Sequence, residues 1–99
     1  MSKFGELIAT STPVLLEFYT NDSSQTEGMN VILRDVAATM GNQVKVIKID
    51  VAKNQKLAEA LRIKGLPTLM IYKDNEMKWR QSGEQDVTTL VSLIEEYVS

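Results

Sequence analysis

The sequence predicts an α/β fold, a sandwich in which helices flank a mixed four-stranded sheet. The near-continuous apolar run Val14–Tyr19 has the length of a strand and fits one buried on both faces. A segment of helical periodicity separates it from the β-branched run Val44–Asp50, so these two strands should be parallel with a right-handed crossover. Two further strand patterns flank a tight turn at Asp74-Asn75, which is typical of an antiparallel hairpin.

The helices of the first half follow from local signals. Residues Phe4–Thr10 are weakly helical and end at Ser11-Thr12-Pro13. Ser24 and Glu27 match a capping box at the start of a longer helix, and Gly41-Asn42 closes it. The inward face of that helix is predicted from apolar residues at helical spacing: Met29, Ile32, Leu33, Val36, Ala37 and Met40.

The second half predicts two helices around the hairpin. Asn54–Leu61 forms a short helix, and Gly65-Leu66-Pro67 a turn. The hairpin strands are expected at Thr68–Tyr72 and Met77–Gln81. Asp86 can cap a last helix with a clear apolar stripe, Val87, Leu90, Val91, Ile94, Tyr97 and Val98. No repeat or linker interrupts the chain, so residues 1–99 are expected to form one domain.

The composition excludes several classes of chemistry. The chain has neither cysteine nor histidine, which removes disulfides, thiolate nucleophiles, histidine general bases and the usual zinc sites. A net charge of −2 gives no basic excess for nucleic acid. No apolar run is long enough to span a membrane, and the first residues lack the apolar core of a secretory signal. We therefore expect a cytoplasmic protein with no cofactor and no metal.

Four sequence blocks in register resemble the thioredoxin family. They are V-L-L-E-F-Y at Val14–Tyr19, K-I-D at Lys48–Asp50, I-K-G-L-P-T-L at Ile63–Leu69, and Gly83 after the hairpin. The resemblance extends from Val14 to Val98 and implies a thioredoxin-like sandwich with a cis peptide bond before Pro67. Only thirteen residues precede Val14. We therefore expect the family's usual first strand to be missing, leaving Val44–Asp50 as an edge that Lys45 and Lys48 protect from pairing.

The family's catalytic motif is absent. Where thioredoxins have W-C-G-P-C, this chain reads Asp22-Ser23-Ser24-Gln25-Thr26, so the cysteine positions fall on Ser23 and Thr26. Dithiol–disulfide exchange needs an attacking thiolate and a resolving thiol, and hydroxyl groups replace neither. The resemblance therefore implies the fold without oxidoreductase activity, and we expect no enzyme of that class.

Glu17 is the polar residue inside the first strand. The resemblance places it where the family has a buried acid that assists proton transfer, and Lys48 matches a lysine near that acid. An ionised carboxylate in an apolar site is costly unless it is protonated or paired. Glu17 is either a tuned acid beneath a new site, half of an inherited pair with Lys48, or a side chain that reaches solvent.

Three functional hypotheses remain. In thioredoxins the backbone before the proline pairs with an extended substrate peptide. The leading hypothesis is a redox-inactive module that binds a peptide or protein partner in a groove lined by Asp22, Ser24, Gln25, Leu66, Pro67 and Gly83. The first alternative is a homodimeric structural or assembly protein that uses the edge strand or the groove. The second is a glutathione-like ligand binder, because the free backbone N–H groups and the dipole at the predicted helix start around Ser23 favour anions, although Asp22 and Glu27 already supply negative charge.

Overall fold

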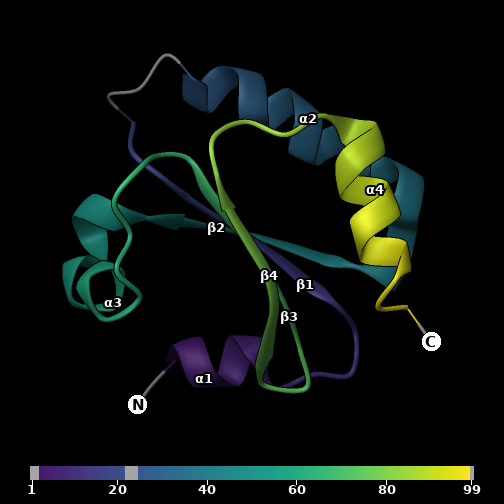
Figure 1. The fold of residues 1–99 in the computed structure, drawn as a ribbon, viewed down its shortest axis with the longest axis horizontal. Coiled ribbons are helices and arrows are strands. Elements are labelled where there is room, and N and C mark those ends of the chain that lie inside the picture. The colour runs from purple at the N-terminus through teal and green to yellow at the C-terminus, as the bar shows by residue number, and fades with distance from the viewer. Residues whose placement is uncertain (1–2, 22–24, 99) are drawn as a thin grey trace.

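The computed structural model describes residues 3–21 and 25–98, in which one mixed sheet separates two layers of helices (Figure 1). The strands are β1 (Val14–Tyr19), β2 (Lys45–Asp50), β3 (Thr68–Lys73) and β4 (Glu76–Ser82). The helices are α1 (Lys3–Ile8), α2 (Gln25–Met40), α3 (Gln55–Ala60) and α4 (Val87–Glu95). Two short 3-10 helices, η1 (Gly41–Gln43) and η2 (Val51–Lys53), precede and follow β2.

The sheet has the order β2-β1-β3-β4. β1 and β2 are parallel, with Leu16 opposite Ile47 and Glu17 opposite Lys48, whereas β3 is antiparallel to both β1 and β4. The predicted fold class is therefore confirmed, including the crossover between the first two strands and the position of β2 at an edge of the four-stranded sheet.

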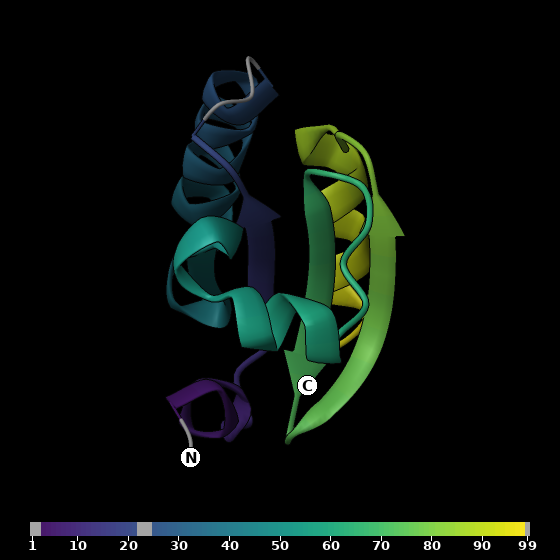
Figure 2. The same ribbon diagram turned by 90° about the vertical axis from the view of Figure 1, so that its left-hand side faces the viewer.

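Alternating side chains of β1 enter two separate cores. Leu15 packs with residues of α2 and α4 on one side of the sheet, whereas Val14, Leu16 and Phe18 pack toward α1 and α3 on the other. In the turned view of Figure 2, α3 lies in front of the strands and α4 lies behind them. Because β1 is central and covered on both faces, all six of its residues except Tyr19 are buried. This double burial is what the near-continuous apolar run predicted.

Helix α2 contacts the core through Met29, Leu33, Val36 and Met40, which are buried as the periodicity predicted. Ala37 was predicted on this inward face but is exposed, because its place on the helix turns toward the open side of β2. Gly41 ends the helix with a φ of 59°, a left-handed conformation that glycine adopts without a Cβ clash.

The second half also follows the predicted order, with shifted ends. Asp74 and Asn75 both have positive φ, as the tight hairpin turn requires. A register shift between Ile71 and Tyr72 adds an irregularity that the alternation did not reveal. The Asp86 side chain accepts a hydrogen bond of 2.8 Å from the Thr89 N–H and caps α4 as predicted. The helix ends at Glu95, earlier than its apolar stripe.

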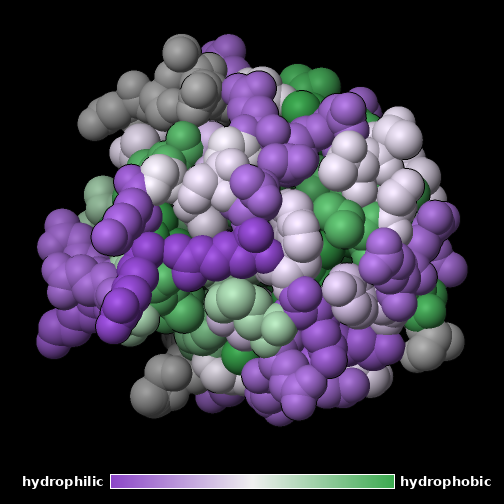
Figure 3. Space-filling model, in the orientation of Figure 1, coloured by the Kyte–Doolittle hydropathy of each residue, from purple (hydrophilic) through white to green (hydrophobic). Residues whose placement is uncertain are grey.

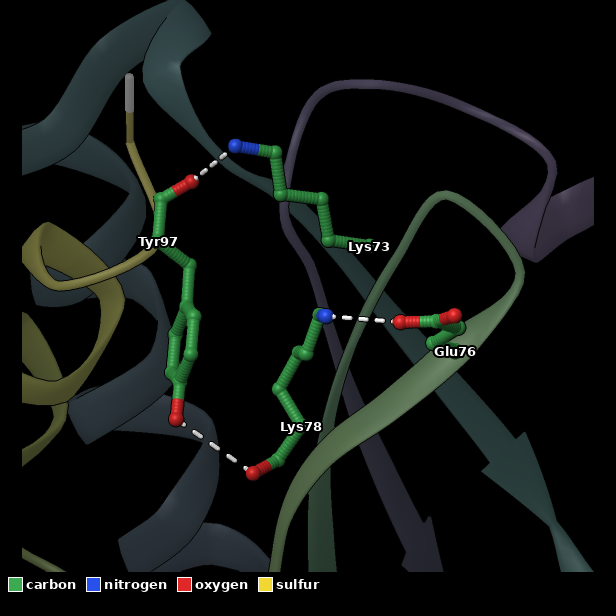
Figure 4. Close-up of polar contacts among 4 residues, drawn as sticks. All are labelled: Lys73, Glu76, Lys78 and Tyr97. Carbon is green, nitrogen blue, oxygen red and sulfur yellow. Dashed lines mark hydrogen bonds and ion pairs between the residues drawn. The ribbon is translucent and has the colours of Figure 1, made fainter.

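The residues after α4 fasten its end to the hairpin (Figure 4). The Lys73 ammonium donates to the Tyr97 carbonyl at 2.5 Å, and the Tyr97 hydroxyl donates to the Lys78 carbonyl at 3.3 Å. Lys78 also forms an ion pair of 2.8 Å with Glu76. These contacts explain why Tyr97 still packs on the core although it lies beyond the helix.

In the view of Figure 3, hydrophilic residues cover much of the face and hydrophobic residues show between them. Among the described helices, none combines the length and the apolar character needed to cross a bilayer.

Candidate functional site

The loop before β3 is held in place by its own carbonyl groups. The Leu66–Pro67 peptide bond is cis, and the Pro67 carbonyl accepts a hydrogen bond of 2.8 Å from the Gly83 N–H. The Thr68 hydroxyl donates to the Gly65 carbonyl at 2.5 Å and lies 3.3 Å from the Ser82 hydroxyl. The loop is thereby fastened to the first residue of β3 and to the end of β4.

Leu66 presents backbone groups beside this anchored proline. Its side chain is half-buried and packs against the core on the α1 and α3 side, while Pro67 is buried. Within residues 3–21 and 25–98, neither the N–H nor the carbonyl of Leu66 has a hydrogen-bond partner. A donor and an acceptor are thus held in a defined position at the surface.

Gly83 lies across from this loop and requires glycine for its conformation. Its φ is 96°, in the region that side chains rarely adopt, although a Cβ there would meet nothing within 4 Å. The space around the Gly83 Cα is therefore open, and it is the backbone conformation that favours glycine here.

An apolar pocket of about 310 Å³ adjoins Leu66 on the α3 side. Five apolar residues and two residues of opposite charge are among those that line it: Val51, Ala52, Ala58, Ile63, Leu66, Glu59 and Lys64. The pocket depends on the way α3 and the following loop pack beside η2, a non-local arrangement that sequence spacing did not predict.

Glu84 brings a second acid to the start of α2. A Cβ built on Gly28 would lie 3.9 Å from Glu84 Oε2, so this carboxylate lies close to the helix although fifty-six positions separate the two residues. Glu27, in the first turn of α2, is exposed. The negative charge disfavours an anionic ligand here, such as the carboxylate of glutathione. The one sequence signal for Glu84 is that it directly follows Gly83, a residue of the predicted groove.

The predicted groove residues of the former motif are described in part. Asp22, Ser23 and Ser24, and with Ser24 the capping box, lie outside the described residues. Gln25 and Thr26 are the first two residues of α2. Of the other predicted groove residues, the structure joins Pro67 to Gly83 by one backbone hydrogen bond, with Leu66 next to Pro67 in the chain.

Glu17 is fully buried, with 0% of its surface exposed, and neither carboxylate oxygen has a hydrogen-bond partner in the described structure. The interpretation that its longer side chain reaches solvent is therefore wrong. Lys48 is its register partner, but the Lys48 ammonium donates to Asn30 Oδ1 and lies 5.0 Å from the centre of the Tyr19 ring. The two residues are neighbours without a direct ion pair.

Burial raises the pKa of Glu17 above its usual range, because the charged form loses its hydration. The nearby positive charge of Lys48 lowers this pKa, but it is the smaller of the two effects. The arrangement can hold a proton on a carboxyl group inside the sheet. The described residues contain no group of three or more acids positioned to hold a metal ion.

A scan of family models matches the thioredoxin model to residues 1–96. A thioredoxin-like protein of Synechocystis sp. is 32% identical over 98 residues, which cover 98% of this chain and 93% of that protein. The chloroplastic thioredoxin Y of Oryza sativa subsp. japonica is 34% identical over 95% of this chain, which spans 56% of that relative.

The fold has close counterparts among solved structures. A mutant thioredoxin from Halobacterium salinarum NRC-1 superposes with a TM-score of 0.89 and 29% sequence identity, over 100% of this chain and 86% of that one. The family model, the relatives and the structural match agree on the fold. The chain belongs to the thioredoxin family and contains no cysteine.

Proposed function

We propose that this chain is a redox-inactive member of its family that binds an extended segment of a peptide or protein partner at the surface formed by Leu66, Pro67 and Gly83. The observation that carries the proposal is the anchored Leu66 backbone, whose N–H and carbonyl have no partner among the described residues. A strand of the partner would supply both hydrogen bonds, as in other cases of strand addition to an exposed edge.

The absence of cysteine decides the kind of activity. Thiol–disulfide exchange proceeds through a mixed disulfide, which this chain has no sulfhydryl group to form. Binding at the surface next to Pro67 is therefore reversible and non-covalent in this proposal. The partner's release depends on its affinity alone, where a redox-active relative would couple release to disulfide transfer.

The pocket beside Leu66 supports a preference for apolar side chains. Its apolar walls are formed by Val51, Ala58 and Ile63, and burial of one aliphatic side chain there would contribute on the order of 1.5–3 kcal/mol. Glu59 and Lys64, which also line the pocket, would contact polar neighbours of that side chain. Hydrogen bonds to the Leu66 backbone would thus fix the register of a bound segment, and the pocket would select its side chain.

Affinity capture from the native host tests the proposal, comparing the wild-type chain with Leu66→Asp. The charged side chain should repel an apolar segment from both the loop and the pocket, and partners should be lost. Leu66→Met, which keeps the volume and the apolar character, should retain them. Thermal unfolding of each variant establishes that it is folded. Identical partner sets for wild type and Leu66→Asp would overturn the proposal.

A second variant covers the case in which Leu66→Asp does not fold. Ser82 is exposed at the end of β4, and its hydroxyl lies beside Thr68 and near Gly65. Ser82→Arg places a long side chain over the loop without altering a buried residue, and Ser82→Thr is its matched control. Retention of all partners by Ser82→Arg would also contradict binding at this surface.

A further inference from the structure

We propose that the outer edge of β2 is a second interaction surface, which pairs with an extended acidic segment of a partner protein. β2 is the end strand of the sheet, so one side of its backbone has no neighbouring strand among the described residues. Lys45 and Lys48 are exposed along it. This surface lies on β2, whereas the proposed function uses the loop before β3.

The direction of the β2 backbone shows which groups face outward. The Lys45 N–H donates to the Pro13 carbonyl at 2.9 Å, so Lys45 faces β1. Successive residues of a strand direct their backbone N–H and carbonyl groups to opposite sides. The backbone groups of Val46 and Lys48 therefore point away from β1, toward the open edge. The Asp50 carbonyl, which also belongs to the outward set, already accepts the Asn54 side-chain amide at 2.9 Å. The free edge therefore offers the donors and acceptors of two residues.

A groove of about 340 Å³ runs between this edge and α2. Its lining residues come from one face of α2 and from β2: Asn30, Leu33, Arg34, Ala37, Val46 and Lys48. Two are cations and none is acidic. An added strand would direct alternate side chains into this groove, where a carboxylate would lie near the guanidinium of Arg34 and the ammonium of Lys48.

Charge makes a second copy of this chain a poor occupant. An antiparallel pair of two β2 edges centred on Lys48 places the two Lys48 side chains directly opposite, and a pair centred on Ile47 places them on adjacent diagonal positions. Like charges at such positions are destabilising. The other sheet edge, β4, carries Lys78 and Arg80 with one acid, Glu76, so it offers no negative excess either. An acidic segment complements the edge.

The test uses a fluorescent peptide of alternating glutamate and valine, with the matching lysine and valine peptide as a control. Anisotropy should show binding of the acidic peptide only, and higher salt should weaken it. Amide hydrogen exchange by NMR should slow at Val46 and Lys48. Equal binding of both peptides, or slowed exchange that omits these two amides, would overturn the proposal.

Two variants separate backbone pairing from charge. Val46→Pro removes an outward N–H and keeps every charge, and a proline there leaves the hydrogen bonds to β1 intact. It should weaken binding at least tenfold. The double change Arg34→Glu with Lys48→Glu leaves the backbone alone and should transfer the preference to the lysine peptide, a result that does not depend on Val46→Pro folding.

The matched control is Lys78→Gln, which removes one positive charge from the opposite edge of the sheet. It should bind the acidic peptide as the wild type does. A comparable loss of affinity in Lys78→Gln, or an unchanged preference in the charge-reversed double variant, would show that the peptide responds to net charge and would contradict the edge site. Self-association that slows exchange at Val46 and Lys48 without peptide would identify a second copy as the occupant and would equally overturn the proposal.

Discussion

Glu17 and Lys48 lie opposite each other on adjacent parallel strands, yet the lysine contacts other groups. Its ammonium donates to Asn30 Oδ1 on α2 and lies over the Tyr19 ring, while both oxygens of Glu17 remain without a hydrogen-bond partner in the described structure. The buried carboxyl is thus influenced by the lysine through charge alone.

The first prediction concerns stability against pH in Glu17→Gln. Burial raises the pKa of Glu17 in the folded chain above its ordinary value of 4.5. Well below 4.5 the folded and unfolded chains are both protonated there, so the group makes no pH-dependent contribution to stability. As pH rises above 4.5, the unfolded chain loses its proton first, and stability falls until the pH has passed the folded pKa. The total loss is about 1.4 kcal/mol for each unit by which the folded pKa is raised.

Glu17→Gln cannot ionise and should lack this fall. Urea denaturation of both proteins between pH 4 and pH 8 checks it, since every other titrating group is shared and cancels in the difference. The free-energy advantage of Glu17→Gln should grow with pH and then level off. A difference that stays constant across the range would show that the carboxyl group is not desolvated in the folded chain.

Removal of the Lys48 charge should raise the pKa of Glu17 further. Lys48 lowers this pKa through its positive charge, which opposes the larger effect of burial. In Lys48→Met, a carboxyl-carbon NMR titration of Glu17 should therefore move to higher pH. Lys45→Met is the control, because Lys45 is exposed on the same strand and is not among the causes of the shift. Equal titrations of Glu17 in the wild type and Lys48→Met would contradict the charge coupling.

Arg80 should stabilise the segment that leads into the candidate site. Its guanidinium donates to the Leu61 carbonyl at 2.6 Å and to the Arg62 carbonyl at 2.8 Å, so it joins β4 to the end of α3. Arg80→Met removes both bonds and should cost about 1–3 kcal/mol in urea denaturation. Arg80→Lys should recover part of this, because an ammonium does not reproduce the planar fork.

Lys78→Met is the matched control for Arg80. Lys78 is a neighbour on β4, and its ion pair with Glu76 is at the exposed end of the hairpin. Exposed pairs contribute little to stability, so the loss should be clearly smaller than for Arg80→Met. Equal losses in the two variants would show that the Arg80 bonds to the α3 end have no special weight.

Restoring the two cysteines tests the alignment of the former motif. The family's cysteine positions correspond to Ser23, which lies outside the described residues, and to Thr26, the second residue of α2. The double change Ser23→Cys and Thr26→Cys should form an intramolecular disulfide under mild oxidation, seen by mass spectrometry as the loss of two hydrogen atoms. The single change Ser23→Cys cannot do so and serves as control. A double variant that forms only intermolecular disulfides would show that the active-site turn has been misplaced.

The fold could be predicted from the sequence because its main signals are local. The apolar run of β1 predicts a strand buried on both faces, the periodicity of α2 predicts an amphipathic helix, and Asp74-Asn75 predicts a hairpin turn. Each pattern lies within one short segment of the chain. The resemblance to the family also predicted that Lys48 lies near Glu17, and the register of β1 and β2 confirms that the two residues are neighbours. The partner of Lys48 could not be predicted, because Asn30 reaches it from α2 after the layers have packed.

Less of the candidate site could be predicted from the sequence. Leu66, Pro67 and Gly83 were selected from short blocks that resemble the family, and the structure brings Pro67 and Gly83 together through one backbone hydrogen bond. Glu84 beside Gly28, the pocket along α3 and the groove along β2 all arise where distant segments meet. No spacing in the chain encodes those contacts.

Amide hydrogen exchange at Leu66 tests the central proposal most directly. The chain is measured alone and then bound to the partner segment that wild-type affinity capture recovers, with resolution of single residues. Binding at the proposed surface predicts that the Leu66 amide exchanges freely in the unbound chain and becomes strongly protected in the complex. A complex in which Leu66 still exchanges at its free rate, while protection appears elsewhere on the chain, would contradict the proposed function.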